Sequence, residues 1–230
     1  MRRALFIILI AILPSAVNAQ RPPTGIWTAI NMPVQLSKHW QWHNDGSYRT
    51  LGNSTAPLQY LYRPGIRYIL NKKWNVASGV AFFFTKTDFE KSHHEFGKEF
   101  RLWQEGQLQE SIGIWKLQFR FRSEQRFFEA TSLKNKYTAH RFRLKATAIK
   151  MMSQKWGLLL ASEYMRQLKK GVALNFDQSR VIASAIYQPT STLHVQAGYM
   201  WLKWPEASQH ILSITVVKNI KLYEQREARK

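Results

Sequence analysis

Charged and aromatic side chains alternate along one stretch of this chain. Polar residues take every second position: Lys116, Gln118, Arg120, Arg122, Glu124 and Arg126. The positions between them are mostly apolar: Trp115, Leu117, Phe119, Phe121 and Phe127. A period of two is the pattern of a strand, whose successive side chains point to opposite faces. A row of guanidinium groups along one face is suited to binding or passing anions.

Other segments place basic residues on what we expect to be the same face. The proposed binding residues are Arg63, Arg67, Arg101, Arg120, Arg122, Arg141, Arg143, Glu163 and Arg180. Two interpretations of this face remain open. Cross-strand ion pairs can fill the lumen of a narrow barrel, which offsets the cost of burying charge. Alternatively, the excess of base over acid makes a weakly anion-selective passage or binding cleft.

Catalytic and metal-binding alternatives have weaker support. Ser162 and Glu163 are adjacent in the chain, so a strand points them to opposite faces, and the same parity separates His210 from Ser213. A nucleophile and its base must converge, so we expect no enzyme activity. The run His93–Glu95 offers neighbouring ligands without a partner cluster, so we predict no metal and no cofactor.

The amino terminus predicts export. Arg2 and Arg3 precede an apolar run over Ala4–Leu13, and Val17–Ala19 supplies the small-residue cleavage pattern. The run is shorter than the roughly 20 residues that a spanning helix needs. We therefore predict a cleaved signal peptide over residues 1–19 and a single domain over residues 20–230. Polar residues interrupt every later apolar stretch, so a mature chain that enters a membrane must form a closed barrel.

Strand-like segments recur at nearly even spacing. We expect strands near residues 40–49, 58–70, 74–85, 99–109, 112–128, 137–150, 156–167, 176–187, 193–203 and 210–221. Short turns alternate with longer links at 50–57, 86–98, 129–136, 169–175 and 205–209, as in outer-membrane barrels. Gly25–Leu36 also has a strand pattern. Adding it gives eleven strands, an odd number. The segment is therefore folded inward, or one hairpin has been miscounted, or a twelfth strand exists. The fold class is an all-β, antiparallel, up-and-down transmembrane β-barrel of 10–12 strands.

Composition restricts the partners. The chain has 34 Lys and Arg against 14 Asp and Glu and no Cys. This excess favours anionic partners. Export excludes nucleic acid, so we expect outer-membrane lipid and small anions as partners of a monomer in the bacterial outer membrane. Two alternatives are an exported soluble lipocalin-like barrel, with its apolar face inward, and an outer-membrane lipid-modifying enzyme. Tryptophans near strand ends fit membrane-interface girdles better.

Several short motifs follow one another in an order that resembles a known family. They are Trp27 soon after the signal peptide, Arg63–Trp74, His140–Arg143, Ser162–Tyr164, Phe176–Arg180 and Ala197–Trp201. Over nearly the whole mature chain they resemble the family catalogued as domain of unknown function 2490. The resemblance implies an exported outer-membrane barrel and no particular activity. The charged tail Glu224–Lys230 departs from the usual barrel, which ends near an aromatic residue.

Overall fold

The computed structural model describes residues 24–50, 52, 56–87, 95–169 and 172–223, and nearly all of them are in strands. The expected signal peptide and the charged tail lie outside these residues. All ten strands that the alternation predicts are present, as β3 to β12, with closely similar bounds. The strands are β1 (Thr24–Asn31), β2 (Val34–Gln35), β3 (Trp40–Thr50), β4 (Pro57–Ile69), β5 (Trp74–Lys86), β6 (Phe96–Ile112), β7 (Trp115–Phe128), β8 (Tyr137–Met151), β9 (Trp156–Lys169), β10 (Val172–Thr190), β11 (Leu193–Lys203), β12 (Ser208–Lys218) and β13 (Ile220–Lys221).

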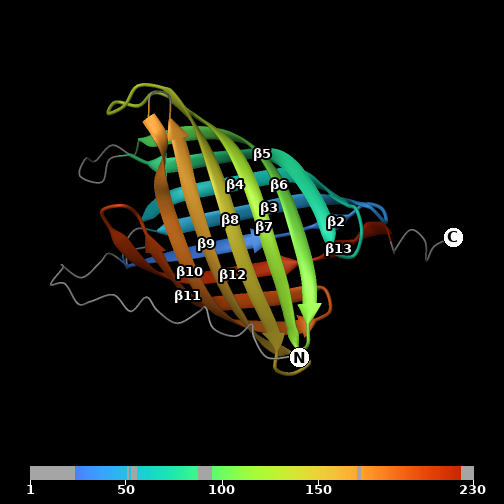
Figure 1. Ribbon diagram of the computed structural model, residues 1–230. Helices are drawn as coiled ribbons and strands as arrows, with labels where there is room; N and C mark the ends of the chain where they lie inside the picture. The colour runs from blue at the N-terminus through green and yellow to red at the C-terminus, as the bar shows by residue number, and fades with distance from the viewer. Residues whose placement is uncertain (1–23, 51, 53–55, 88–94, 170–171, 224–230) are drawn as a thin grey trace, which may run out of the picture.

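The strands form a closed barrel in which sequence neighbours from β3 to β12 pair antiparallel (Figure 1). β1 closes it, because it pairs antiparallel with β3 on one side and parallel with β12 on the other. The described strands thus confirm an up-and-down barrel, with eleven long strands in the wall. An odd meander starts and ends with strands that run in the same direction, so its closing pair has to be parallel.

The segment Gly25–Leu36 therefore contributes a strand to the barrel wall. It is not folded inward, no hairpin of the ten predicted strands was miscounted, and the described residues contain no twelfth long strand. β1 ends at Asn31, and the short β2 follows after Pro33. Proline has no backbone N–H and so interrupts a ladder. The Pro33 carbonyl still accepts from the Ile220 N–H at 2.9 Å, and β2 pairs parallel with β13.

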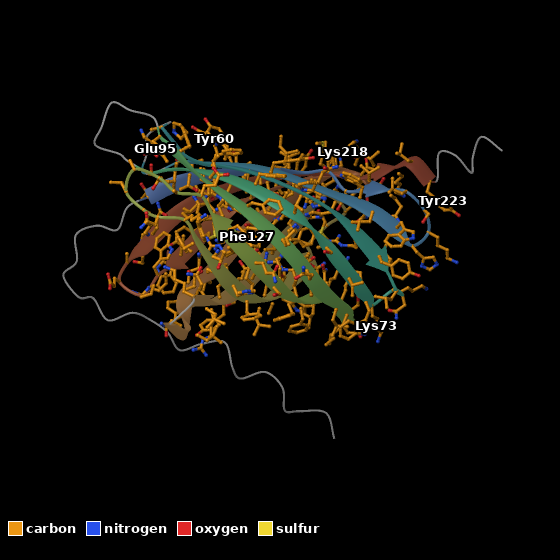
Figure 2. All side chains as sticks on the ribbon, turned by 90° about the horizontal axis from the view of Figure 1, so that it is seen from above. Tyr60, Lys73, Glu95, Phe127, Lys218 and Tyr223 are labelled. Carbon is orange, nitrogen blue, oxygen red and sulfur yellow. The ribbon has the colours of Figure 1, made fainter. Side chains whose placement is uncertain are left out.

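The two ends of the barrel differ in the length of their connections. The links after β3, β5 and β7 are long, whereas the turns after β4, β6, β8 and β10 are short. Glu95 and Tyr60 lie at the long-link end and Lys73 and Tyr223 at the other (Figure 2). The expected long link over residues 169–175 is wrong, because β9 extends to Lys169 and β10 begins at Val172. Described strand residues thus take up much of the expected loop, with Lys169, Val172 and Asn175 paired between β9 and β10.

The outer face of the wall is apolar and the inner face is charged. Large exposed side chains on the outside include Trp40, Trp42, Trp74, Phe82, Phe119, Phe121, Trp156 and Tyr164. Buried charged side chains on the inside include Glu99, Arg101, Glu105, Arg122, Glu124, Arg141, Arg143 and Glu163. This polarity matches a membrane barrel and is the reverse of a lipocalin-like barrel. Within the described ranges, no helix has the length and apolar character to cross a bilayer.

A tryptophan fills a notch made by two glycines on the inner wall. Gly65 and Gly79 are paired across β4 and β5, and a Cβ at either would approach Trp103 Cζ2 to 2.4 or 2.8 Å. The Trp103 side chain is 1% exposed and donates from Nε1 to the Val80 carbonyl at 3.0 Å. The small inward residues of β5 thus leave room for a bulky neighbour.

Candidate functional site

The inner faces of β6 to β10 carry most of the lumenal charge, and shared carboxylates organise it. Glu163 of β9 is 2% exposed and serves three arginines. Arg120 Nη2 donates to its Oε1 at 2.5 Å and Arg143 Nη2 to the same oxygen at 2.9 Å, while Arg180 Nη1 lies 3.5 Å from Oε2. The single negative charge of Glu163 is therefore shared by arginines from β7, β8 and β10.

Glu105 of β6 is shared in the same way. Arg122 donates to its Oε2 from Nη2 at 2.6 Å and from Nε at 2.9 Å. Arg120 Nε lies 3.7 Å from the same oxygen, and Arg67 Nη2 donates to Oε1 at 3.4 Å. The Arg122 guanidinium also lies over the Trp103 ring, 4.9 Å from its centroid. This cluster fills the lumen beside the glycine notch.

Two further glutamates connect Arg101, Arg126 and Arg143 of β6 to β8. Glu99 accepts from Arg101 Nε at 2.6 Å and from Arg126 Nε at 2.5 Å. Glu124 accepts from Arg101 at 3.0 Å and from Arg143 at 2.8 Å. Because Arg101 and Arg143 each bind two carboxylates, the ion pairs form one connected network.

Not every base has a carboxylate within 4.0 Å. Among the described residues, Arg49 and Lys145 form no ion pair with Asp or Glu. Arg49 donates instead to the neutral Gln59 Oε1 at 2.6 Å, and its guanidinium lies 4.1 Å from the Trp27 ring centroid. The network therefore leaves a surplus of positive charge.

This surplus faces a cavity of about 500 Å³ inside the barrel. One side of the cavity is the arginine-rich wall of β6 to β9. The other side, from β10 to β12 and β1, carries Arg180 as its one charged lining residue among the described residues and contributes Ser184, Gln196, Ser213 and Thr215 beside apolar side chains such as Met200 and Leu202. The cavity can therefore hold an anion on one side and offer hydroxyl and amide groups on the other.

Most of the binding residues expected from the sequence meet at this cavity. Its lining includes Arg63, Arg101, Arg120, Arg141, Arg143, Glu163 and Arg180. Arg67 and Arg122 face the lumen but do not line the cavity, because they bind Glu105 beside the glycine notch. Arg63 is paired with Asp45, and Arg141 Nη2 donates to Asp177 at 2.9 Å.

Sequence reasoning missed Trp27 as a lumenal residue. Arg49 and Arg180 both lie over its ring, at 4.1 and 5.2 Å from the centroid. The parity of Gly25, Trp27 and Ala29 would have assigned them to one face. It could not place that face in the lumen, because β1 had no assigned place in the wall.

The described strands keep the candidate catalytic pairs apart. Ser162 is exposed on the outer face, whereas the Glu163 side chain is buried inside. His210 contacts Tyr199 on the outer face, and Ser213 Oγ donates to the Gly198 carbonyl at 3.3 Å and lines the cavity. His93 and His94 lie outside the described residues. Glu95 binds the backbone and hydroxyl of Ser132.

Comparison with known proteins gives a family and two distantly similar solved structures. The model of the family described as "Protein of unknown function (DUF2490)" matches residues 24–208. No curated protein sequence matches the chain significantly. Two solved structures are similar to it at 14% identity: in-vitro folded OmpT, an outer membrane protein of Vibrio cholerae, with a TM-score of 0.43, and outer-membrane expressed OmpT of the same organism, with 0.42. They cover 73% and 72% of this chain, which spans 51% and 55% of theirs.

Proposed function

The chain belongs to the DUF2490 family of proteins of unknown function, and from that premise we propose that it is an outer-membrane barrel whose basic lumen binds and passes small anions. The observation that carries the proposal is the surplus of positive charge along a lumenal cavity. Arg49 and Lys145 face this cavity with no carboxylate oxygen within 4.0 Å among the described residues. Unpaired buried charge is costly, so water or an anion has to accompany it.

The outer face supports the membrane location. Trp40, Trp74 and Trp156 begin β3, β5 and β9 at the short-turn end, and each is 46–54% exposed. Tryptophans at strand ends are typical of the membrane–water interface, and the apolar band between the girdles faces lipid. Outer-membrane barrels keep their short turns on the periplasmic side. In this orientation Gln59 and Thr85, which line the cavity, lie toward the long links outside the cell.

Planar-bilayer recording of the full folded chain tests this proposal. Under a KCl gradient, we expect a reversal potential that shows selectivity for chloride over potassium, because fixed positive charge enriches anions in the lumen. Neutralising Lys145 by Lys145→Gln should reduce this selectivity without leaving a carboxylate unpaired. Lys116→Gln is the control, since Lys116 is exposed and does not line the cavity.

Heat-modifiable migration in detergent gels verifies that each protein is folded before it is recorded. Cation-selective current from the folded parent would contradict the proposal. A folded protein that leaves the bilayer silent would contradict anion passage and favour a barrel closed by its ion-pair network.

A further inference from the structure

Two lumenal arginines are held by neutral amide oxygens, and neither has a carboxylate that binds it alone. Arg49 Nη1 donates to Gln59 Oε1 at 2.6 Å. Arg180 donates to Gln178 Oε1 from Nη2 at 2.9 Å and from Nε at 3.2 Å. An amide oxygen can orient a guanidinium as a carboxylate does, but it carries no charge. The pattern contrasts with Arg101, Arg122 and Arg143, each of which is bound closely by glutamate.

The same two arginines share one aromatic ring. Their guanidinium groups lie 4.1 and 5.2 Å from the centroid of Trp27, although Arg49 belongs to β3 and Arg180 to β10. Glu163 is the carboxylate within 4.0 Å of Arg180, at 3.5 Å, and it is already bound at 2.5 and 2.9 Å by Arg120 and Arg143. Arg49 and Arg180 therefore share little negative charge from the described residues, and an anion from outside the chain would balance them.

The cavity beside these arginines is large enough for more than a simple ion. Its volume of about 500 Å³ is within the range of small-molecule sites. On β10 to β12, Ser184, Gln196 and Thr215 line the cavity and make no side-chain hydrogen bond to another described residue. These hydroxyl and amide groups are available to hydroxyls of a solute.

We infer that Arg49 and Arg180 bind the oxyanion group of a hydroxyl-rich solute, with the chemistry of a sugar phosphate, and that its hydroxyls lie toward Ser184, Gln196 and Thr215. The guanidinium fork suits phosphate oxygens, and Lys145 on the same cavity adds a third positive charge. The inference rests on the proposed function, because it assigns a class of solute to the same lumen.

The two glutamines provide a near-isosteric test. Gln178→Glu replaces the neutral acceptor of Arg180 with a carboxylate, which supplies the missing counter-charge from within the chain. Calorimetric titration of the folded protein in detergent with glucose 6-phosphate should give saturable binding. Gln178→Glu should weaken it at least about tenfold, because it replaces a charge-assisted contact of the ligand. Gln59→Glu should act in the same way through Arg49.

Gln109→Glu is the matched control. Gln109 accepts from Gln118 Nε2 at 3.3 Å and does not line the cavity, so its replacement should leave the affinity unchanged. Equal affinities of the parent and Gln178→Glu for glucose 6-phosphate, with both proteins folded, would overturn the assignment of the site.

Inorganic phosphate and glucose separate the two parts of the inference. We expect phosphate to bind more weakly than glucose 6-phosphate and glucose not to bind. Phosphate that binds as tightly as the ester would overturn the role of the hydroxyl-binding wall, and glucose that binds as tightly would overturn the role of the arginines. The bilayer result is independent: chloride-selective current without saturable glucose 6-phosphate binding refutes this inference alone, and binding without current refutes passage alone.

Discussion

Glu163 has more arginine partners than one negative charge can neutralise. Replacing it by Glu163→Gln leaves Arg120, Arg143 and Arg180 with less counter-charge in a buried place. Removal of one partner from a buried pair costs on the order of 3–5 kcal/mol, because the other charge remains desolvated. We expect a lower unfolding midpoint in urea titrations of the detergent-solubilised barrel, followed by the gel shift.

The exposed carboxylate of Glu110 is the control for that substitution. It lies 2.6 Å from Lys73 Nζ at the short-turn end, with 38% of its side chain exposed. Water and salt screen such a pair, so Glu110→Gln should leave the midpoint nearly unchanged. If the two variants lower the midpoint equally, the lumenal network does not stabilise the barrel as described.

The alternation of residues along each strand is enough to predict that the arginines point inward. It is not enough to predict which residues they bind. Arg120 and Glu163 are on β7 and β9, with β8 between them, and Arg180 reaches Trp27 from β10 to β1. Such contacts depend on wall curvature and on where the barrel closes. A pattern of alternating residues contains neither quantity, so the division between paired and unpaired bases could not be predicted.

At the scale of elements, the glycine notch fixes how β4, β5 and β6 fit together. A Cβ at Gly79 would lie 2.3 Å from the Pro64 carbonyl oxygen and 2.8 Å from Trp103 Cζ2. We expect Gly79→Ala to destabilise the barrel by about 1–3 kcal/mol, because both backbone and ring must move. The same urea titration measures this loss.

Gly106→Ala tests whether the effect belongs to the notch. A Cβ at Gly106 would meet nothing within 4 Å, and glycine weakens a strand interior. This variant should be as stable as the parent or slightly more so. If the Gly79→Ala and Gly106→Ala proteins have the same unfolding midpoint in urea, the notch tolerates a methyl group.

Strand positions were predictable because hydrophobic alternation and turn residues agree along most of the chain. The exceptions have local causes. Lys169–Asn175 contains polar residues that suggest a loop, but Lys169 ends β9 and residues 172–175 begin β10, with shifts in register between Val172 and Gln178. Alternation cannot count such shifts, since a bulge adds a residue without ending the strand.

At the scale of the whole molecule, the face polarity predicts where a charge is tolerated. Phe121 is at the middle of β7 and is 48% exposed on the outer face. A basic residue at the bilayer midplane costs about 2–4 kcal/mol. We expect Phe121→Arg to reduce both assembly into lipid vesicles and the stability of the assembled barrel, measured by the gel shift and by urea titration.

Ile112→Arg is the corresponding change near the interface. Ile112 ends β6 and is 60% exposed, and there the same charge costs about 0–1 kcal/mol. Equal assembly of the Phe121→Arg protein and the parent would show that this face does not contact lipid.

The parallel pairing of β1 with β12 has a consequence for the order in which the barrel opens. Residues Thr24–Asn31 meet residues 210–217, so this seam joins the first and last long strands among the described residues and cannot form as a local hairpin. Its closure entropy is the largest in the fold, and parallel ladders are slightly weaker per residue than antiparallel ones. The pairing of β1 with β12 should therefore form last during folding and separate first on warming. Amide hydrogens of β1 are expected to exchange with deuterium before those of β7 and β8, while the ten-strand meander behind them is still intact.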